Sequence, residues 1–474
     1  MPCTTILVGK KASYDGSCII ARNDDSGAGS FTPKKFVVTE PSQQARKYQS
    51  VISGVEIDLP DNPMRYTAMP NAKAGKGIWA ASGVNAANVA MTATETITSN
   101  PRVLGADPLV EKGIGEEDLV YIVLPYIHTA KEGVERLGSL LETYGTYEMN
   151  GIAFADTDEI WWLETIGGHH WMARRVPDDV YVMMPNQLGI DAFDFTDTKN
   201  YLCSKDLQEF VATYHLDLSL DGTFHPRDVF GSHDDSDHIY NTPRAWAMGR
   251  YFNPHDAQWD QKGPQADDLP WCMVPEKKIT IEDVKYALSN HFQGTPYDPY
   301  LSYGDKSMKG AYRAIGVNRT DFLGIIQMRP DAEEDSRAIE WVAFASNVFN
   351  TAAPFYTDVE KVPEYFSNTT GDASTDNFYW ASRMIAAMAD ASYSKSIFHI
   401  ERYQERVMSK GHEYINQYDE LLSKESDAEK RMQLRQEANE KIADMVKKET
   451  QDTLNKVLYE LSNQMKNAYS RSDA

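Results

Sequence analysis

The sequence predicts an α+β fold in which antiparallel sheets are covered by helices, with further helices at the C-terminal end. Three observations predict it: short β-rich runs separated by turn residues, amphipathic helical segments between them, and a change of composition near residue 375. The chain has 474 residues, of which 42% are hydrophobic. A chain of this size and composition can bury a large core.

The predicted strands are short runs of β-forming residues that lie between Gly, Asp, Asn and Pro turns. Their close spacing predicts antiparallel pairing, because parallel strands need long crossover connections. In chain order, the predicted strands are residues 4–8, 18–21, 77–81, 89–94, 151–155, 160–164, 171–175 and 180–184.

Helical patterns are predicted at residues 115–141, 204–214, 243–251 and 280–290, with Thr280 as the N-cap of the last. From residue 376 to about residue 469, Glu, Lys, Gln, Met and Ala dominate, and Gly411 is the only glycine. Apolar residues recur there at spacings of three and four, which predicts long helices. Heptads are not sustained, so we expect these helices to pack on the body rather than form a free coiled coil. The sequence leaves open whether these helices also form contacts between subunits of a homo-oligomer.

The formal charge of −23 excludes nucleic acid and anionic membrane as expected partners, because phosphate binding needs a basic surface. The four cysteines show no paired metal spacing, and the chain has no GxSxG, Walker A, HExxH or CxxC motif. We therefore predict no catalytic metal and no cofactor, and we interpret residues 233–238 as a solvated acidic loop. No signal peptide or membrane span is recognised, so a cytoplasmic protein is expected.

Cys3 is the strongest candidate for a catalytic residue. Cleavage before it would leave a thiol nucleophile and a free α-amine, a suitable proton acceptor, on one residue. A hairpin through residues 11–17 would bring the returning strand and its Arg22 and Asp25 beside the thiol. Arg22 would favour the thiolate and Asp25 would orient the amine, although both also suit a surface ion pair at a strand end.

Several motifs resemble those of one enzyme family. They include Cys3-Thr4-Thr5-Ile6, Arg22-Asn23-x-Asp25 and the segments 84–85, 113–118, 162–165, 175–179, 186–188, 240–246, 294–298 and 316–320. In their order and number, they resemble the N-terminal-nucleophile (Ntn) hydrolases of the choloylglycine hydrolase and penicillin V acylase type. Within that group, the chain is most similar to the bacterial dipeptidase A branch, to which the secernins are related.

The resemblance implies a four-layer αββα sandwich and a cysteine dipeptidase of broad specificity. Residues 1–2 would be a removed propeptide, 3–375 the catalytic domain and 376–474 a helical extension. Cys3 would be the nucleophile, with Arg22, Asp25 and Arg244 as active-site residues and Asn186 as an oxyanion-hole amide. A backbone N–H near Thr94 or Glu95 would complete the hole, and Thr94, Glu95 and Asn85 would contact the dipeptide substrate.

Two other functions remain open from the sequence. An amide acylase of the choloylglycine or penicillin V type would need a wide apolar pocket, and a secernin-like scaffold would keep its N-terminus unprocessed. Pro2 departs from the acylase pattern, in which the cysteine directly follows the initiator methionine, so removal of methionine alone would leave the nucleophile blocked.

Overall fold

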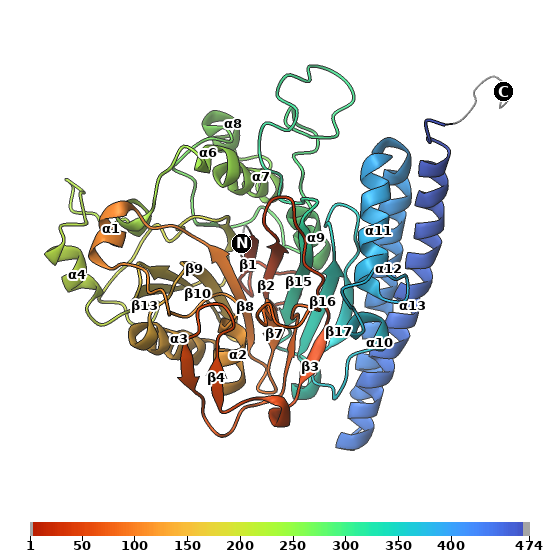
Figure 1. Cartoon of the computed structure of the whole chain (residues 1–474), viewed down its shortest axis with the longest axis horizontal. Helices are drawn as coiled ribbons and strands as arrows, with labels where there is room; N and C mark the ends of the chain where they lie inside the picture. Colours follow the sequence, from red (N-terminus) through yellow and green to blue (C-terminus); the bar gives the residue numbers. More distant parts are fainter. Residues whose placement is uncertain (1–2, 468–474) are drawn as a thin grey trace.

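A computed structural model describes residues 3–467, apart from the side chains of Thr94 and Glu95. Two antiparallel sheets form the centre of the molecule (Figure 1). In spatial order, the seven-stranded sheet contains β14 (Cys272–Met273), β12 (Tyr181–Met184), β1 (Thr4–Val8), β2 (Cys18–Asp25), β15 (Thr320–Met328), β16 (Ala338–Phe344) and β17 (Ala353–Tyr356). The six-stranded sheet contains β13 (Tyr201–Cys203), β11 (His170–Arg175), β10 (Ile160–Ile166), β9 (Asn150–Ala155), β8 (Ala90–Thr96) and β7 (Ser82–Val84).

The remaining elements surround these sheets. Two small antiparallel pairs join β3 (Val37–Thr39) to β6 (Tyr66–Ala68) and β4 (Lys47–Gln49) to β5 (Glu56–Asp58). The helices are α1 (Pro101–Ala106), α2 (Leu119–Val123), α3 (Ala130–Tyr144), α4 (Leu207–Thr213), α5 (Pro226–Phe230), α6 (Asp237–Tyr240), α7 (Thr242–Phe252), α8 (Gln258–Lys262), α9 (Ile281–Leu288), α10 (Glu364–Ser367), α11 (Phe378–Ala391), α12 (Tyr393–Leu422) and α13 (Ala428–Ser462).

The two sheets pack face to face, and helices cover their outer faces. Strand β2 contacts β8 and β9 across the interface, whereas α3 packs on β9 to β11 and α9 on β1, β2 and β15. Side chains alternate along β1: Leu7 lies in the core between the sheets, and Ile6 and Val8 lie in the core under the helices. This arrangement confirms the α+β prediction. No helix among residues 3–467 is both long enough and apolar enough to cross a bilayer.

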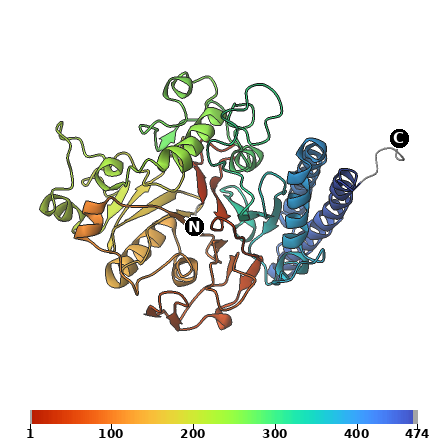
Figure 2. The ribbon, with the colours of Figure 1, turned by 45° about the horizontal axis from the view of Figure 1, so that its top comes forward.

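The C-terminal helices pack on the edge of the seven-stranded sheet (Figures 1 and 2). The Asn439 side chain of α13 pairs with the backbone N–H and C=O of Tyr356, which satisfies polar groups of the edge strand β17. A Cβ on Gly411 of α12 would lie 2.7 Å from Pro354 Cδ, so glycine permits this close approach. Helices α12 and α13 thus contact the edge strand of the sheet, while the division at residue 375 stays a prediction.

Most predicted strands are present with shifted ends, but two strand predictions and one helix prediction need correction. Residues 77–81 form no strand, because Trp79 and Ala81 have φ values of 49° and 59°, which are incompatible with extended pairing. The predicted 18–21 strand continues as β2 to Asp25, since its polar end pairs with β15. The predicted 115–141 helix is divided into α2 and α3. The predicted N-cap is confirmed, because the Thr280 hydroxyl at the start of α9 accepts from the Asp283 N–H.

Candidate active site

The candidate site lies at one end of four adjacent strands. In the order β12, β1, β2 and β15, the end of each strand lies beside the start of its antiparallel neighbour. Asn186 follows β12, Cys3 precedes β1 and Asp25 ends β2. The sheet topology thus brings together residues that lie far apart in the sequence.

The Cys3 thiol is buried and lies beside a guanidinium group. Arg22 faces Thr5 in the β1–β2 register, and its Nη2 donates to Cys3 Sγ at 2.9 Å. A cation in this position stabilises a thiolate relative to a thiol. The predicted contact between Cys3 and Arg22 is therefore present.

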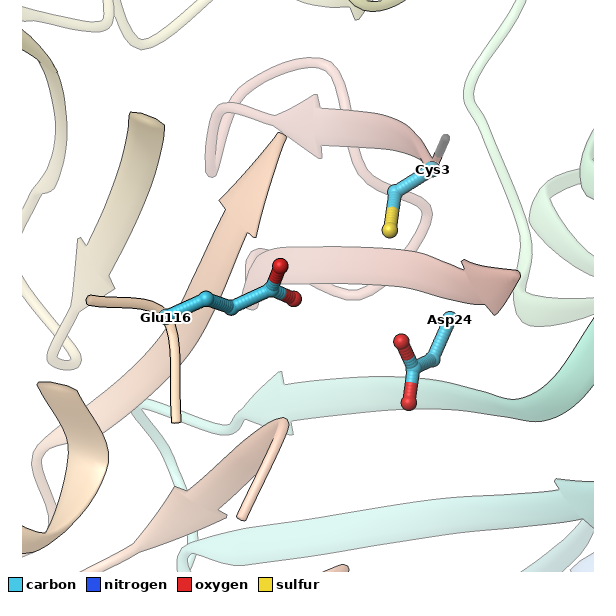
Figure 3. A group of neighbouring side chains, drawn as sticks. All are labelled: Cys3, Asp24 and Glu116. Atoms are coloured by element: carbon cyan, nitrogen blue, oxygen red, sulfur yellow. The ribbon is translucent and has the colours of Figure 1, made fainter. Parts of the chain in front are cut away.

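Two buried carboxylates share the same guanidinium. Arg22 Nη2 lies 3.1 Å from both Asp24 Oδ1 and Glu116 Oε1, and Figure 3 shows these carboxylates and the thiol pointing toward one another. Asp24 also forms a 2.8 Å ion pair with Lys34, which is only 1% exposed. Burial would raise the pKa of Asp24, but Lys34 and Arg22 hold that pKa below its usual value. Asp24 is therefore ionised at neutral pH.

The ligand atoms of Cys3, Asp24 and Glu116 lie within 4.8 Å of one another, a spacing that would also suit a metal ion. Arg22 Nη2, however, already lies at hydrogen-bond distance from all three groups. Its charge compensates the carboxylates, and a cation about 2.0–2.3 Å from the same atoms would have to displace it. The donor set therefore fits an arginine-centred cluster.

Arg244 on α7 connects Cys3 to Asn186. Its guanidinium is fully buried and donates to the Cys3 carbonyl oxygen, to Thr4 Oγ1 at 2.6 Å and to Asn186 Oδ1 at 2.7 Å. It also donates to Asn241 Oδ1 at 2.7 Å and to the Tyr240 carbonyl oxygen. These contacts fix the backbone at the start of β1.

Asn186 is half-buried and is held by both its backbone and its side chain. Its backbone N–H donates to Asn241 Oδ1, and its carbonyl oxygen accepts from Asn241 Nδ2, each at 3.1 Å. Because its Oδ1 accepts from Arg244, the Nδ2 group is the donor end of the amide. Through Arg244, this fixed amide is connected to the backbone of Cys3, and a fixed amide donor is the chemistry that an oxyanion hole needs.

Asp25 lies on the other face of β2 from Arg22 and Asp24. Its carboxylate accepts from Arg313 Nη2 at 2.5 Å and from Thr320 Oγ1 at 2.6 Å. Burial raises the pKa of Asp25, and Arg313 and Thr320 oppose the shift. The carboxylate that shares Arg22 with the thiol is Asp24, and the predicted contact of Asp25 with an α-amine stays a prediction.

The comparison with known proteins identifies the family. A family model described as Peptidase family C69 matches residues 2–406. The chain belongs to peptidase family C69. This C69 member is therefore a peptide hydrolase, and the resemblance to the dipeptidase branch is confirmed.

Several curated relatives are similar to this C69 peptidase over nearly their whole length. "Probable dipeptidase A" of Streptococcus pyogenes serotype M3 is 55% identical, and "Dipeptidase" of Bifidobacterium longum is 50% identical, each over 100% of both chains. "Dipeptidase A" of Lactobacillus helveticus is 43% identical over 97% of this chain and 96% of its own.

The structure describes the side chain of Asn85, but not those of Thr94 and Glu95, among the three predicted substrate-binding residues of this C69 peptidase. Asn85 is 4% exposed; its Nδ2 donates to the Leu124 and Ile127 carbonyls, and its Oδ1 accepts from two backbone N–H groups of its own turn. These contacts give Asn85 a structural role, and its contact with the substrate stays a prediction. The side chains of Thr94 and Glu95 lie outside the described residues, although the β8–β9 register shifts between Ala93 and Glu95, a bulge of the kind found near active sites.

A buried acidic segment next to the site was not assigned a role from the sequence. Glu116, Glu117 and Asp118 are all at most 3% exposed, and the Glu116 N–H donates to Glu148 at 2.8 Å. Burial, followed by repulsion from Glu116, raises the pKa of Glu148 to about 7. Strand alternation in β2 would have indicated Asp24, because residues two apart share a face. Glu116 lies in a motif-bearing segment, but nothing in the sequence indicates its partner.

The other cysteines lie in different environments. Burial raises the pKa of Cys18 to about 12, with Asp156 adding to the effect. Burial likewise raises the pKa of both Cys203 and Cys272 to about 11. These thiols stay protonated at neutral pH, so the cation beside Cys3 distinguishes it chemically.

Proposed function

We propose that this C69 peptidase is a cysteine dipeptidase of the Ntn hydrolase type that cleaves free dipeptides of broad composition. The observation that carries the proposal is the Cys3 thiol beside Arg22, with its backbone joined to the Asn186 amide through Arg244. The relatives named dipeptidase support the substrate class. The two stacked sheets with outer helices support the αββα assignment.

In the proposed reaction, the Cys3 thiolate attacks the amide carbonyl carbon of the dipeptide. The oxyanion accepts a hydrogen bond from Asn186 Nδ2 and one from a backbone N–H near Thr94 or Glu95. The α-amine of Cys3 takes the thiol proton and passes it to the leaving amine, so that the C–N bond breaks and a thioester forms. Water then attacks the thioester, which releases the first amino acid and regenerates the thiol.

The mechanism requires Cys3 to become the first residue. We propose that its thiol attacks the preceding Pro2 carbonyl, which transfers the acyl group from nitrogen to sulfur, and that water then releases Pro2 as a free acid. Residues 1–2 lie outside the described residues, so the support is chemical: only an N-terminal cysteine carries its own amine base.

The test combines turnover with the state of the N-terminus. Wild type is incubated with free dipeptides, with the same dipeptides acetylated at the amine and with a glycine-conjugated bile acid, each with and without a chelator. We expect cleavage of the free dipeptides alone, in the presence of chelator, and loss of activity on alkylation by iodoacetamide. Cys3→Ala is expected to fold, to retain Pro2 and to lose most activity, since loss of a protease nucleophile costs up to about 10⁶-fold in kcat.

Cys272→Ala is the matched control, because Cys272 is a half-buried thiol that stays protonated. It should keep wild-type turnover and the wild-type N-terminus. Full activity of a protein that still begins with Pro2 would refute the amine-as-base mechanism. Faster cleavage of acetylated dipeptides or of the bile-acid conjugate would instead establish an acylase.

A further inference from the structure

The segment just before β15, residues 316–320, reaches the same sheet end as Cys3. Thr320 is paired with Asp25 at the end of β2, and its Oγ1 donates to the Asp25 carboxylate at 2.6 Å. Strand order then places β15 next to β2 and β2 next to β1. Arg319, one residue before β15, therefore lies at the end of the sheet that carries the thiol.

The backbone around Arg319 is held on both sides. The Ser26 N–H donates to the Arg319 carbonyl oxygen at 3.0 Å. Arg383 of α11 donates to the carbonyl oxygens of Asn318, at 2.5 Å, and Thr320, at 2.8 Å. Arg319 thus starts from a fixed backbone position, which is what a specific binding residue needs.

The guanidinium of Arg319 is half-buried, and its Nε is buried without a hydrogen-bond partner in the described part of the chain. Burial and the neighbouring Arg313 lower the pKa of Arg319, whereas Asp25 and Cys3 oppose this shift. The Asp25 carboxylate, which acts on this guanidinium electrostatically, already accepts from Arg313 and Thr320.

Two other arginines of the site, Arg22 and Arg244, are engaged with the protein. Arg22 donates to the thiol and to two carboxylates, and Arg244 donates to five oxygen atoms of the enzyme. The family resemblance implies an active-site role for Arg244. Its contacts show that it positions the enzyme's own groups.

We infer that Arg319 binds the free α-carboxylate of the dipeptide, on the leaving-group side of the scissile bond. This inference rests on the proposed dipeptidase function. Arginine suits the role because its planar N–H pairs match both oxygens of a carboxylate. Asp24 and Glu116 are already compensated by Arg22 on the face of β2 toward the second sheet, whereas Asp25 and its Arg313 partner lie on the other face.

The test compares a free dipeptide, such as alanyl-alanine, with its C-terminal amide, using wild type, Arg319→Gln and Arg319→Lys. For the free dipeptide, Arg319→Gln should lower kcat/KM by about 30-fold or more, mainly through KM, since an unpaired buried charge typically costs at least about 2 kcal/mol. The amide should be affected much less, so the preference for the free acid collapses. Arg319→Lys should restore part of that preference.

Arg250→Gln, a substitution of an exposed arginine on α7, should keep the wild-type preference. The iodoacetamide reaction of Cys3 and the melting temperature report whether each variant keeps an intact site. If Arg319→Gln lowers the cleavage of the free dipeptide and of the amide equally, or if it lowers neither, the assignment of Arg319 is wrong while the dipeptidase function stands. If wild type cleaves no dipeptide, both the proposed function and this inference are overturned.

Discussion

Replacing Arg244 by lysine separates the positioning role of this residue from a simple need for positive charge. The guanidinium serves two pairs of acceptors, Cys3 O with Thr4 Oγ1 and Asn186 Oδ1 with Asn241 Oδ1. Lysine has a single nitrogen and cannot serve both pairs. At least two buried acceptors then lose a charged donor. At about 1.5–3 kcal/mol for each such hydrogen bond, the free energy of unfolding should fall by about 3–6 kcal/mol.

Activity should fall as well, because the Asn186 amide loses the contact that orients it. Loss of one oxyanion donor costs about 10²- to 10³-fold in kcat, which sets the expected range for Arg244→Lys. The assay measures kcat and KM with a free dipeptide and the free energy of unfolding in urea. Arg250→Lys on the same helix is the matched control: its side chain is 39% exposed, so it should change stability by less than about 1 kcal/mol.

A double-mutant cycle gives the decisive result. If Arg244 acts on the reaction through Asn186, then Arg244→Lys in an Asn186→Ala background should lower kcat only slightly further. Wild-type kcat in Arg244→Lys, or fully additive losses in the double variant, would refute this reasoning.

Two further predictions concern Glu164 and Asn85. Burial raises the pKa of Glu164 to about 7, and its Oε1 accepts from the Gly189 N–H. Between about pH 4.3, the unfolded pKa, and about pH 7, the native state holds a proton that the unfolded state has lost, so stability should fall by up to about 1.4 kcal/mol per pH unit as pH rises. Glu164→Gln should flatten this profile in urea unfolding from pH 5 to 8; an unchanged slope would contradict the assignment. Asn85→Ala should lose about 2–4 kcal/mol of stability by leaving buried backbone groups unpaired, while KM for dipeptides stays unchanged. A raised KM at equal stability would instead return Asn85 to the substrate site.

Local sequence patterns predict the part of the site that lies within one hairpin. The turn between β1 and β2 and the alternation of side chains are enough to bring Arg22 to Cys3, as the Thr5–Arg22 pairing bears out. The family resemblance added Asn186, which follows β12, and Arg244, which lies on α7. No local sequence pattern relates either residue to Cys3.

Contacts across long sequence separations could not be predicted in this way. Glu116 reaches Arg22 from a segment before α2, and Arg313 reaches Asp25 from nearly the far end of the catalytic body. Both contacts depend on which strands become neighbours and on which face of the first sheet meets the second sheet. The hydrophobic periodicity within one segment predicts neither of these. Asn85 shows a related limit of motif matching: the motif predicts a substrate contact, but it does not indicate that the side chain also satisfies the backbone of a tight turn.

The charges around Cys3 are better explained by function than by stability. Burying Arg22, Asp24 and Lys34 costs desolvation energy that their mutual attraction does little more than offset, and apolar residues of similar volume often stabilise a fold equally well. A nucleophilic thiolate, however, needs a fixed cation, and that cation needs compensating carboxylates to remain buried in one geometry. The ion pairs at the end of β2 therefore hold Arg22 at the thiol, and the proposed chemistry depends on that position.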